Sequence, residues 1–269
     1  MVETSPWLRW LLRLVTVGYV TFLVGWPVAL VAGRTFDHGL TNLTVALSDP
    51  DVVHALQLTG EVAAVAVAIN LVFGVGMSLL LVRYRFPGRR VLSTLIDLPP
   101  AVSPVVVGLA LLLVYNGRDG LFGTQLEAYG IQVIFAAPGI VMATVFVSLP
   151  LVVREVVPVL EEIGTEQEQA ATSLGAGPVA TFRRITLPAI KWALTYGLVL
   201  ALARSLGEFG AVNIVSGNLV GQTQTATLVV QQSYQNFEQG TAYATAFILA
   251  VASVACITVV SIVRPKERS

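Results

Sequence analysis

The sequence predicts an all-α, polytopic membrane protein with six transmembrane helices. Of its 269 residues, 55% are hydrophobic and only 12% are charged, and the mean hydropathy is +0.77. This apolar share exceeds that of soluble domains. A bilayer core about 30 Å thick needs about 20 mostly apolar residues for each crossing helix. Six segments qualify, and we expect helices near Leu11–Ala32, Leu56–Val82, Leu95–Tyr115, Ile131–Val153, Trp192–Val215 and Ala242–Val263.

The first three spans carry distinct signals. The first run is too long for the hydrophobic region of a signal peptide and lacks a clear small-x-small cleavage site, so we expect a retained span. In the second, Gly74 and Gly76 are predicted to be helix-packing surfaces. The third is interrupted by Pro99, Pro100 and Pro104. These prolines predict a kinked or partly unwound crossing, which needs protein or a water-lined cavity around its freed backbone groups.

Basic residues are distributed unevenly along the chain. Because they accumulate on cytoplasmic loops, they predict that both termini are cytoplasmic. The connections between spans are short, so residues 1–269 are expected to form a single membrane domain. Thirteen of the sixteen basic residues fall on one predicted side: Arg9, Arg13, Arg83, Arg85, Arg89, Arg90, Arg154, Arg183, Arg184, Lys191, Arg264, Lys266 and Arg268.

Several function classes are excluded by what the sequence lacks. Cys256 is the single cysteine, so no internal disulfide is possible, and His38 and His54 are isolated. No G-x-x-x-x-G-K-[ST] phosphate loop occurs, and no nucleophile, metal or acid/base constellation is visible. A net charge of zero gives no indication of nucleic-acid binding. We therefore expect no catalytic, cofactor or metal site in this chain.

The most informative stretch is a polar segment at about residues 160–190, between the fourth and fifth spans. Its centre is Thr165–Pro188, with the sequence TEQEQAATSLGAGPVATFRRITLP. Thr165 and Glu168 have the spacing of a capping box, which predicts a helix start. A capped helix exposed to water between spans predicts a docking surface for a soluble partner.

The second half of this segment predicts a turn and another short helix. Gly175 and Gly177 can end the first helix, because glycine accepts the left-handed conformation. Pro178 suits the first turn of the next helix. The step before Pro188 is expected to end that helix, since a proline disfavours helical geometry in the residue before it.

This segment resembles the signature of the permease subunits of bacterial ATP-binding cassette (ABC) importers, E-A-A, three residues, G, nine residues, then I-x-L-P. The chain departs from it at the first position, where Gln169 stands and Glu168 lies one residue earlier. In that family the segment forms coupling helices that sit in a groove of the ATPase subunit. The resemblance implies a type I ABC importer permease fold in a bacterial plasma (inner) membrane. The matching positions are Ala170, Ala171, Gly175, Ile185, Leu187 and Pro188.

Other stretches resemble sulfate, thiosulfate and molybdate permeases. This resemblance implies uptake of sulfate and thiosulfate by alternating access, with two copies of an ATPase that binds ATP and magnesium. It also implies a second homologous permease subunit, an extracytoplasmic sulfate-binding protein and contact with membrane lipid. The stretches are Ser48–Thr59, Tyr84–Arg90, Asp97–Gly108, Leu149–Leu160 and Ala203–Gly217.

Arg204 and Glu208 lie four residues apart in the predicted fifth span, and so on one helix face. Charges inside a bilayer are costly unless they are paired or face a cavity. Two readings stay open: a place in the path of a divalent oxyanion, or a structural ion pair that fixes the span to a neighbouring helix, which we favour. Gly207 and Gly210 are expected to permit a bend or a close helix approach.

Neutral donors suit an anion path better than carboxylates do. The hydroxyl of Ser103 and the backbone amides near Pro104 can coordinate sulfate without trapping it. Asp97 is expected to cap the broken helix or to pair with Arg89 or Arg90.

Two alternatives remain. The first is a molybdate or tungstate permease of the same class. The second is an ATP-independent channel or secondary anion transporter, in which the polar cytoplasmic segment would be dispensable. We find no internal repeat, which counts against an inverted-repeat transporter.

Overall fold

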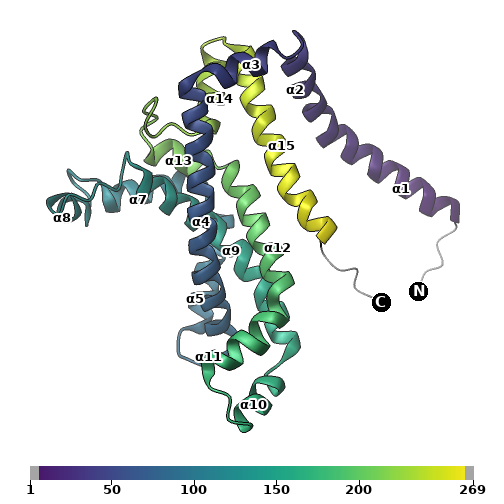
Figure 1. Ribbon diagram of the computed structural model, residues 1–269, viewed down its shortest axis with the longest axis vertical. Coiled ribbons are helices and arrows are strands. Elements are labelled where there is room, and N and C mark those ends of the chain that lie inside the picture. Colours follow the sequence, from purple (N-terminus) through teal and green to yellow (C-terminus); the bar gives the residue numbers. More distant parts are fainter. Residues whose placement is uncertain (1–5, 264–269) are drawn as a thin grey trace.

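The computed structural model describes residues 6–263, and every regular element in that range is helical (Figure 1). Two of the elements are π-helical turns, η1 (Thr21–Gly25) and η2 (Phe182–Thr186). The α-helices are α1 (Pro6–Val20), α2 (Trp26–Phe36), α3 (Thr41–Ser48), α4 (Pro50–Arg83), α5 (Arg89–Ile96), α6 (Leu98–Ala101), α7 (Pro104–Tyr115), α8 (Gly123–Ala128), α9 (Ala137–Ile163), α10 (Glu166–Ser173), α11 (Pro178–Thr181), α12 (Leu187–Leu206), α13 (Gly210–Val215), α14 (Ala226–Gln235) and α15 (Gln239–Val263).

Five helices of the described chain are long and apolar enough to cross a membrane, which confirms the all-α polytopic class. They are Trp7–Phe36, Pro50–Arg83, Ala137–Ile163, Pro178–Leu206 and Gln239–Thr258.

The third predicted span, Leu95–Tyr115, is not one helix. The chain breaks at Asp97 and again at Val102 and Ser103, and only α7 is a sustained apolar helix there. Proline explains the breaks, because it disfavours helical geometry before it and tolerates the first helical turn.

The predicted fifth span, Trp192–Val215, is also placed differently. Its helix begins at Pro178 and ends at Leu206, and α13 is a separate element after a break at Gly207.

Helices α4, α9 and α12 pack side by side and meet at Val152, which is fully buried. A Cβ built on Gly74 of α4 would lie 2.7 Å from Val152 Cγ1, and one built on Gly197 of α12 would lie 3.0 Å from Val152 Cα. Both glycines therefore set the distance between these helices. The packing role predicted for Gly74 is therefore confirmed. The same role predicted for Gly76 is not, because a Cβ built on Gly76 would meet nothing within 4 Å.

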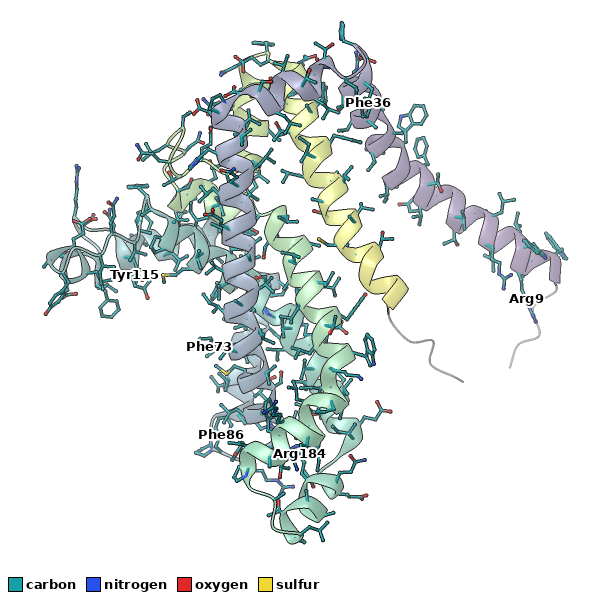
Figure 2. All side chains as sticks on the ribbon, in the orientation of Figure 1. Arg9, Phe36, Phe73, Phe86, Tyr115 and Arg184 are labelled. Atoms are coloured by element: carbon teal, nitrogen blue, oxygen red, sulfur yellow. The ribbon has the colours of Figure 1, made fainter. Side chains whose placement is uncertain are left out.

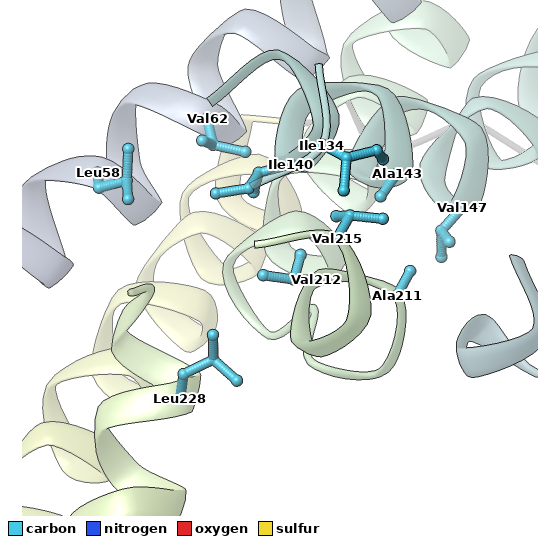
Figure 3. Close-up of a cluster of buried hydrophobic side chains, with 10 residues drawn as sticks. All are labelled: Leu58, Val62, Ile134, Ile140, Ala143, Val147, Ala211, Val212, Val215 and Leu228. Atoms are coloured by element: carbon cyan, nitrogen blue, oxygen red, sulfur yellow. The ribbon is translucent and has the colours of Figure 1, made fainter. Parts of the chain in front are cut away.

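A second buried cluster holds the shorter helices against α4 and α9 (Figure 3). It brings together side chains from α4, α9, α13 and α14 and from the segment before α9. Its members are Leu58, Val62, Ile134, Ile140, Ala143, Val147, Ala211, Val212, Val215 and Leu228.

The first crossing, α1–η1–α2, stands away from the bundle (Figure 1). No residue in its most apolar 18-residue window is buried. Its contact with α15 is at its end, where Thr35 Oγ1 donates to the carbonyl oxygen of Tyr243 at 3.0 Å and the rings of Phe36 and Phe247 pack edge to face. An apolar helix this exposed needs lipid or another protein around it.

The two ends of the molecule differ. Helices α5, α10 and α11 lie at one end and α3 and α14 at the other (Figure 1), and Figure 2 shows Phe86 and Arg184 together at the first end. Three of the basic residues that predict the orientation, Arg264, Lys266 and Arg268, lie outside the described residues.

Replacing Gly74 by alanine is expected to lower the free energy of unfolding by about 1–3 kcal/mol, because the added methyl overpacks the contact with Val152. Gly76→Ala is the matched control, since Gly76 lies on the same helix with open space around it. Thermal unfolding of the purified chain in detergent measures both. Equal midpoints would show that Gly74 does not set the helix distance.

Candidate functional site

The polar segment forms an elbow, defined here as residues 164–181, which contains α10 and α11. Helix α10 ends in a Schellman motif: Gly175 has a φ of 86°, its N–H donates to Thr172 O at 2.9 Å, and the Ala176 N–H donates to Ala171 O at 3.0 Å. The prediction that Gly175 ends the first helix is confirmed. Gly177 instead precedes Pro178 as the first residue outside α11.

The predicted capping box is wrong. Thr165 makes no side-chain cap bond, and its hydroxyl oxygen accepts instead from Gln169 Nε2 at 3.0 Å. Glu168 does not reach back to the helix start, because its carboxylate is held by Arg83 at the end of α4. Arg83 Nε lies 3.0 Å from Glu168 Oε2, and Nη2 donates to Oε1 at 3.2 Å. The Thr186 hydroxyl also donates to Oε1, at 2.7 Å.

The helix predicted to end before Pro188 does not end there. The helix runs unbroken from Pro178 to Leu206, with η2 directly preceding α12. A proline removes one donor and clashes with the carbonyl four residues earlier, here that of Arg184. The wider π turn, in which the Leu187 N–H bonds to Phe182 O, relieves this conflict and lets the helix continue.

The outer surface of the elbow is open. Neither α10 nor α11 buries any residue, and at its tip Leu174 is 90% exposed and Val179 78% exposed. A groove of about 740 Å³ lies between the elbow and the end of α4. Apolar side chains displayed beside such a groove suit contact with another protein.

The predicted coupling residues divide between the two faces. Glu168 faces the bundle, and Ile185 and Leu187 are half-buried in the helix that leaves the elbow. Ala171 is half-buried as well. The exposed members are Gln169, Ala170, Gly175 and Pro188.

A second region of interest is the contact between the two interrupted spans, α7 and α13. A Cβ built on Gly108 of α7 would lie 2.8 Å from Ala211 O, and one built on Gly210 would lie 3.0 Å from Pro104 Cβ. We call this the broken-span contact. It brings together the two stretches, Asp97–Gly108 and Ala203–Gly217, that the sequence singles out separately. The predicted close approach at Gly210 is confirmed.

Arg204 and Glu208 form an ion pair where α12 ends and the chain turns toward α13, with Arg204 Nη1 2.7 Å from Glu208 Oε2. Glu208 is not on the same helix face, however, because α12 ends at Leu206. Its side chain is 2% exposed, against 39% for Arg204.

Further bonds anchor Glu208 at both its side chain and its backbone. Oε1 accepts from the Ala211 N–H at 3.0 Å, and the Glu208 carbonyl oxygen accepts from Thr227 Oγ1 at 2.9 Å. Glu208 therefore joins the end of α12 to α13 and α14.

The remaining candidates lie at the start of α7. Ser103 is exposed and makes no side-chain cap bond, while Pro104 is half-buried against Gly210. Asp97 does not pair with Arg89 or Arg90. Its Oδ1 lies 2.9 Å from Arg154 Nε in a half-exposed pair.

Sequence reasoning missed three residues: Arg83, Thr186 and Thr227. Their partners lie 85, 18 and 19 residues away along the chain, so no local spacing could reveal them. Among the described residues, no group of three or more His, Cys, Asp or Glu side chains could hold a metal ion.

Comparison with known proteins places the chain among transport proteins. The family model for the binding-protein-dependent transport system inner membrane component matches residues 70–269. The chain is 46% identical over 231 residues to the sulfate transport system permease protein CysW of Synechococcus elongatus, covering 86% of this chain and 80% of that protein. It is 42% identical over 248 residues to CysW of Escherichia coli K12, covering 92% and 85%.

A solved structure shares the fold. A chain of the bacterial alginate ABC transporter, crystallised in complex with an alginate pentasaccharide-bound periplasmic protein, superposes with a TM-score of 0.77 at 16% identity, covering 94% of this chain and 92% of that one. The helices, the family match and the related sequences agree. The chain belongs to the family of binding-protein-dependent transport system inner membrane components.

Proposed function

We propose that the chain is the permease subunit of an ATP-driven importer that carries sulfate, and thiosulfate, into the cytoplasm by alternating access. The observation that carries the proposal is the elbow. Its helix α10 ends in a Schellman motif, and the elbow buries no side chain and exposes Leu174 and Val179. The cargo is inferred from relatives named as sulfate permeases that match most of the chain.

The elbow is the proposed docking site for a separate ATPase subunit. Two copies of that subunit would bind ATP and magnesium, one at each of two permease elbows. Closure of the ATPase dimer would move the elbows and turn the membrane helices as rigid bodies between inward-open and outward-open states. Small Ala170 and Ala171 permit close approach of the partner, and Gly175 forms the turn.

The charge distribution supports an elbow on the cytoplasmic side. Arg83, Arg85, Arg89, Arg90 and Arg184 lie on elements at the elbow end (Figures 1 and 2), as positive residues do on cytoplasmic loops. A sulfate-binding protein would then dock at the opposite end, near α3 and α14. The solved alginate transporter, which is a complex with a periplasmic protein, supports such a partner.

A second permease subunit is supported by the exposed first crossing. Because α1–η1–α2 buries none of its most apolar window, a neighbouring permease and lipid together would cover it. A homologous second subunit would also supply the other half of the transport path.

The anion path is proposed to run beside the broken-span contact. Here Ser103 offers a free hydroxyl and Arg204 a half-exposed guanidinium, while Glu208 limits the positive field so that a bound oxyanion is released. Irregular backbone at membrane depth is tolerated where it lines a cavity, which fits the two breaks lying together.

The docking role predicts that Gly175→Glu abolishes sulfate uptake and weakens copurification of the ATPase subunit. The substitution places a large charged side chain at a φ of 86°, in the middle of the docking face. The matched control is Gly130→Glu, because Gly130 also has a positive φ, of 75°, and open space, on the α8–α9 connection. Full uptake by the Gly175 variant would contradict docking at the elbow.

The path predicts that Ser103→Ala lowers sulfate uptake about ten-fold, the worth of one hydrogen bond to a charged group. Copurification of the ATPase should not change, because Ser103 is not part of the elbow. Ser93→Ala, at an exposed position on α5, is the control. Unchanged uptake would remove Ser103 from the path.

The cargo is tested by competition. Uptake of labelled sulfate into cells or proteoliposomes is expected to fall with excess unlabelled sulfate or thiosulfate, and much less with molybdate. Stronger inhibition by molybdate than by sulfate would favour a molybdate or tungstate permease. Uptake that persists without any ATPase subunit would favour an ATP-independent transporter.

A further inference from the structure

Arg83, the last residue of α4, connects four helices at the base of the elbow. Its Nη1 donates to the Leu160 carbonyl oxygen at 3.0 Å, one of the last four carbonyls of α9. Its Nη2 donates to Glu168 Oε1 of α10 at 3.2 Å, its Nε lies 3.0 Å from Oε2 of the same carboxylate, and Glu168 accepts from Thr186 at the start of α12. The Arg83 and Glu168 side chains are only 11% and 21% exposed. A guanidinium can donate to the Leu160 carbonyl and the Glu168 carboxylate at once from two nitrogens, whereas lysine has a single nitrogen.

Other non-covalent anchors of α10 are weak. The helix buries no residue, so packing against an apolar core does not hold it in place. The hydrogen bonds of its other polar side chains are local, such as those from Gln169 to Thr165 and from Ser173 to the Gln169 carbonyl oxygen. Within the part of the chain that the structure describes, each side-chain hydrogen bond between α10 and a helix outside the elbow ends on Glu168.

The backbone connections on either side of α10 can change direction easily. Gly164, between α9 and α10, has a φ of 62° and a ψ of −159°, a conformation nearly restricted to glycine, and no side chain hinders it. On the other side, the turn at residues 174–177 separates α10 from the helix that runs unbroken from Pro178 to Leu206. Neither joint fixes the direction of α10, so that direction depends on the Arg83–Glu168 pair.

We propose that Arg83 is a positioning residue that makes the elbow move as one body with α4, α9 and α12. Without it, the elbow would still dock on an ATPase, but its movement would be absorbed at Gly164. This inference rests on the proposed docking of an ATPase at the elbow. It assigns Glu168 to the inside of the permease and not to the docking face.

The first test uses the chain alone. Spin labels at Leu174→Cys on the elbow and Phe73→Cys on α4, in a Cys256→Ser background, report the distance between these elements. We expect the distance distribution to become about two-fold broader in Arg83→Ala and in Glu168→Ala, because local order is lost. Arg89→Ala is the matched control, since its pair with Glu161 spans 3.9 Å and is about half exposed. An unchanged distribution in Arg83→Ala overturns the inference.

The second test uses the complete importer in proteoliposomes. Arg83→Ala is expected to retain its ATPase subunit and ATP hydrolysis, while sulfate taken up per ATP falls about ten-fold, because the residue that couples the elbow to the membrane helices is lost. For Arg83→Lys, the sulfate taken up per ATP should lie between the values for the unaltered importer and for Arg83→Ala. The double variant Arg83→Ala/Glu168→Ala should be no worse than either single variant, because both remove the same contact.

The outcomes separate this inference from the proposed function. Independent, multiplying losses in the double variant, or loss of the ATPase subunit from Arg83→Ala, would overturn the positioning role. If the unaltered chain neither retains an ATPase nor takes up sulfate, the proposed function fails. The spin-label distances still decide whether Arg83 holds the elbow.

Discussion

The backbone of this chain must satisfy its own hydrogen bonds within the bilayer, because the hydrocarbon core offers no water. This constraint explains why the two breaks at α7 and α13 lie against each other, with Gly108 close to Ala211 and Gly210 close to Pro104. It also explains the burial of Glu208. Its carboxylate accepts from an N–H at the start of α13, and its carbonyl oxygen, which follows the end of α12, accepts from Thr227.

Helix α12 connects the two regions of interest. It begins beside Thr186, which is bonded to Glu168, and its last turn carries Arg204, which is paired with Glu208. Between these ends, Gly197 packs on Val152 so closely that α12 cannot slide along α9 without a clash. A displacement of α12 at its elbow end would therefore be passed to α9. The break at Gly207 is the first place where α12 and the broken-span contact can move separately.

The sequence was informative where a residue acts on its own segment. Apolar runs predicted the long helices, prolines predicted the broken third crossing, and Gly175 predicted the end of α10. It was less informative where a distant partner decides the outcome. Glu168 leaves its capping role because a guanidinium 85 residues away binds it. The helix continues through Pro188 because a π turn relieves the clash between proline and the preceding helical turn. No pattern in the sequence predicts that π turn.

The departure from the E-A-A pattern at Gln169 has a structural reason. Adjacent helix positions point about 100° apart, so residues 168 and 169 cannot both face the bundle. Glu168 lies on the inner face with Arg83, and exposed Gln169 bonds to Thr165 on the outer one. The carboxylate has therefore not simply moved by one position, because it serves the inside of the permease. An ATPase groove that receives this elbow would meet an amide at position 169, and it needs no cation there to pair with a charge.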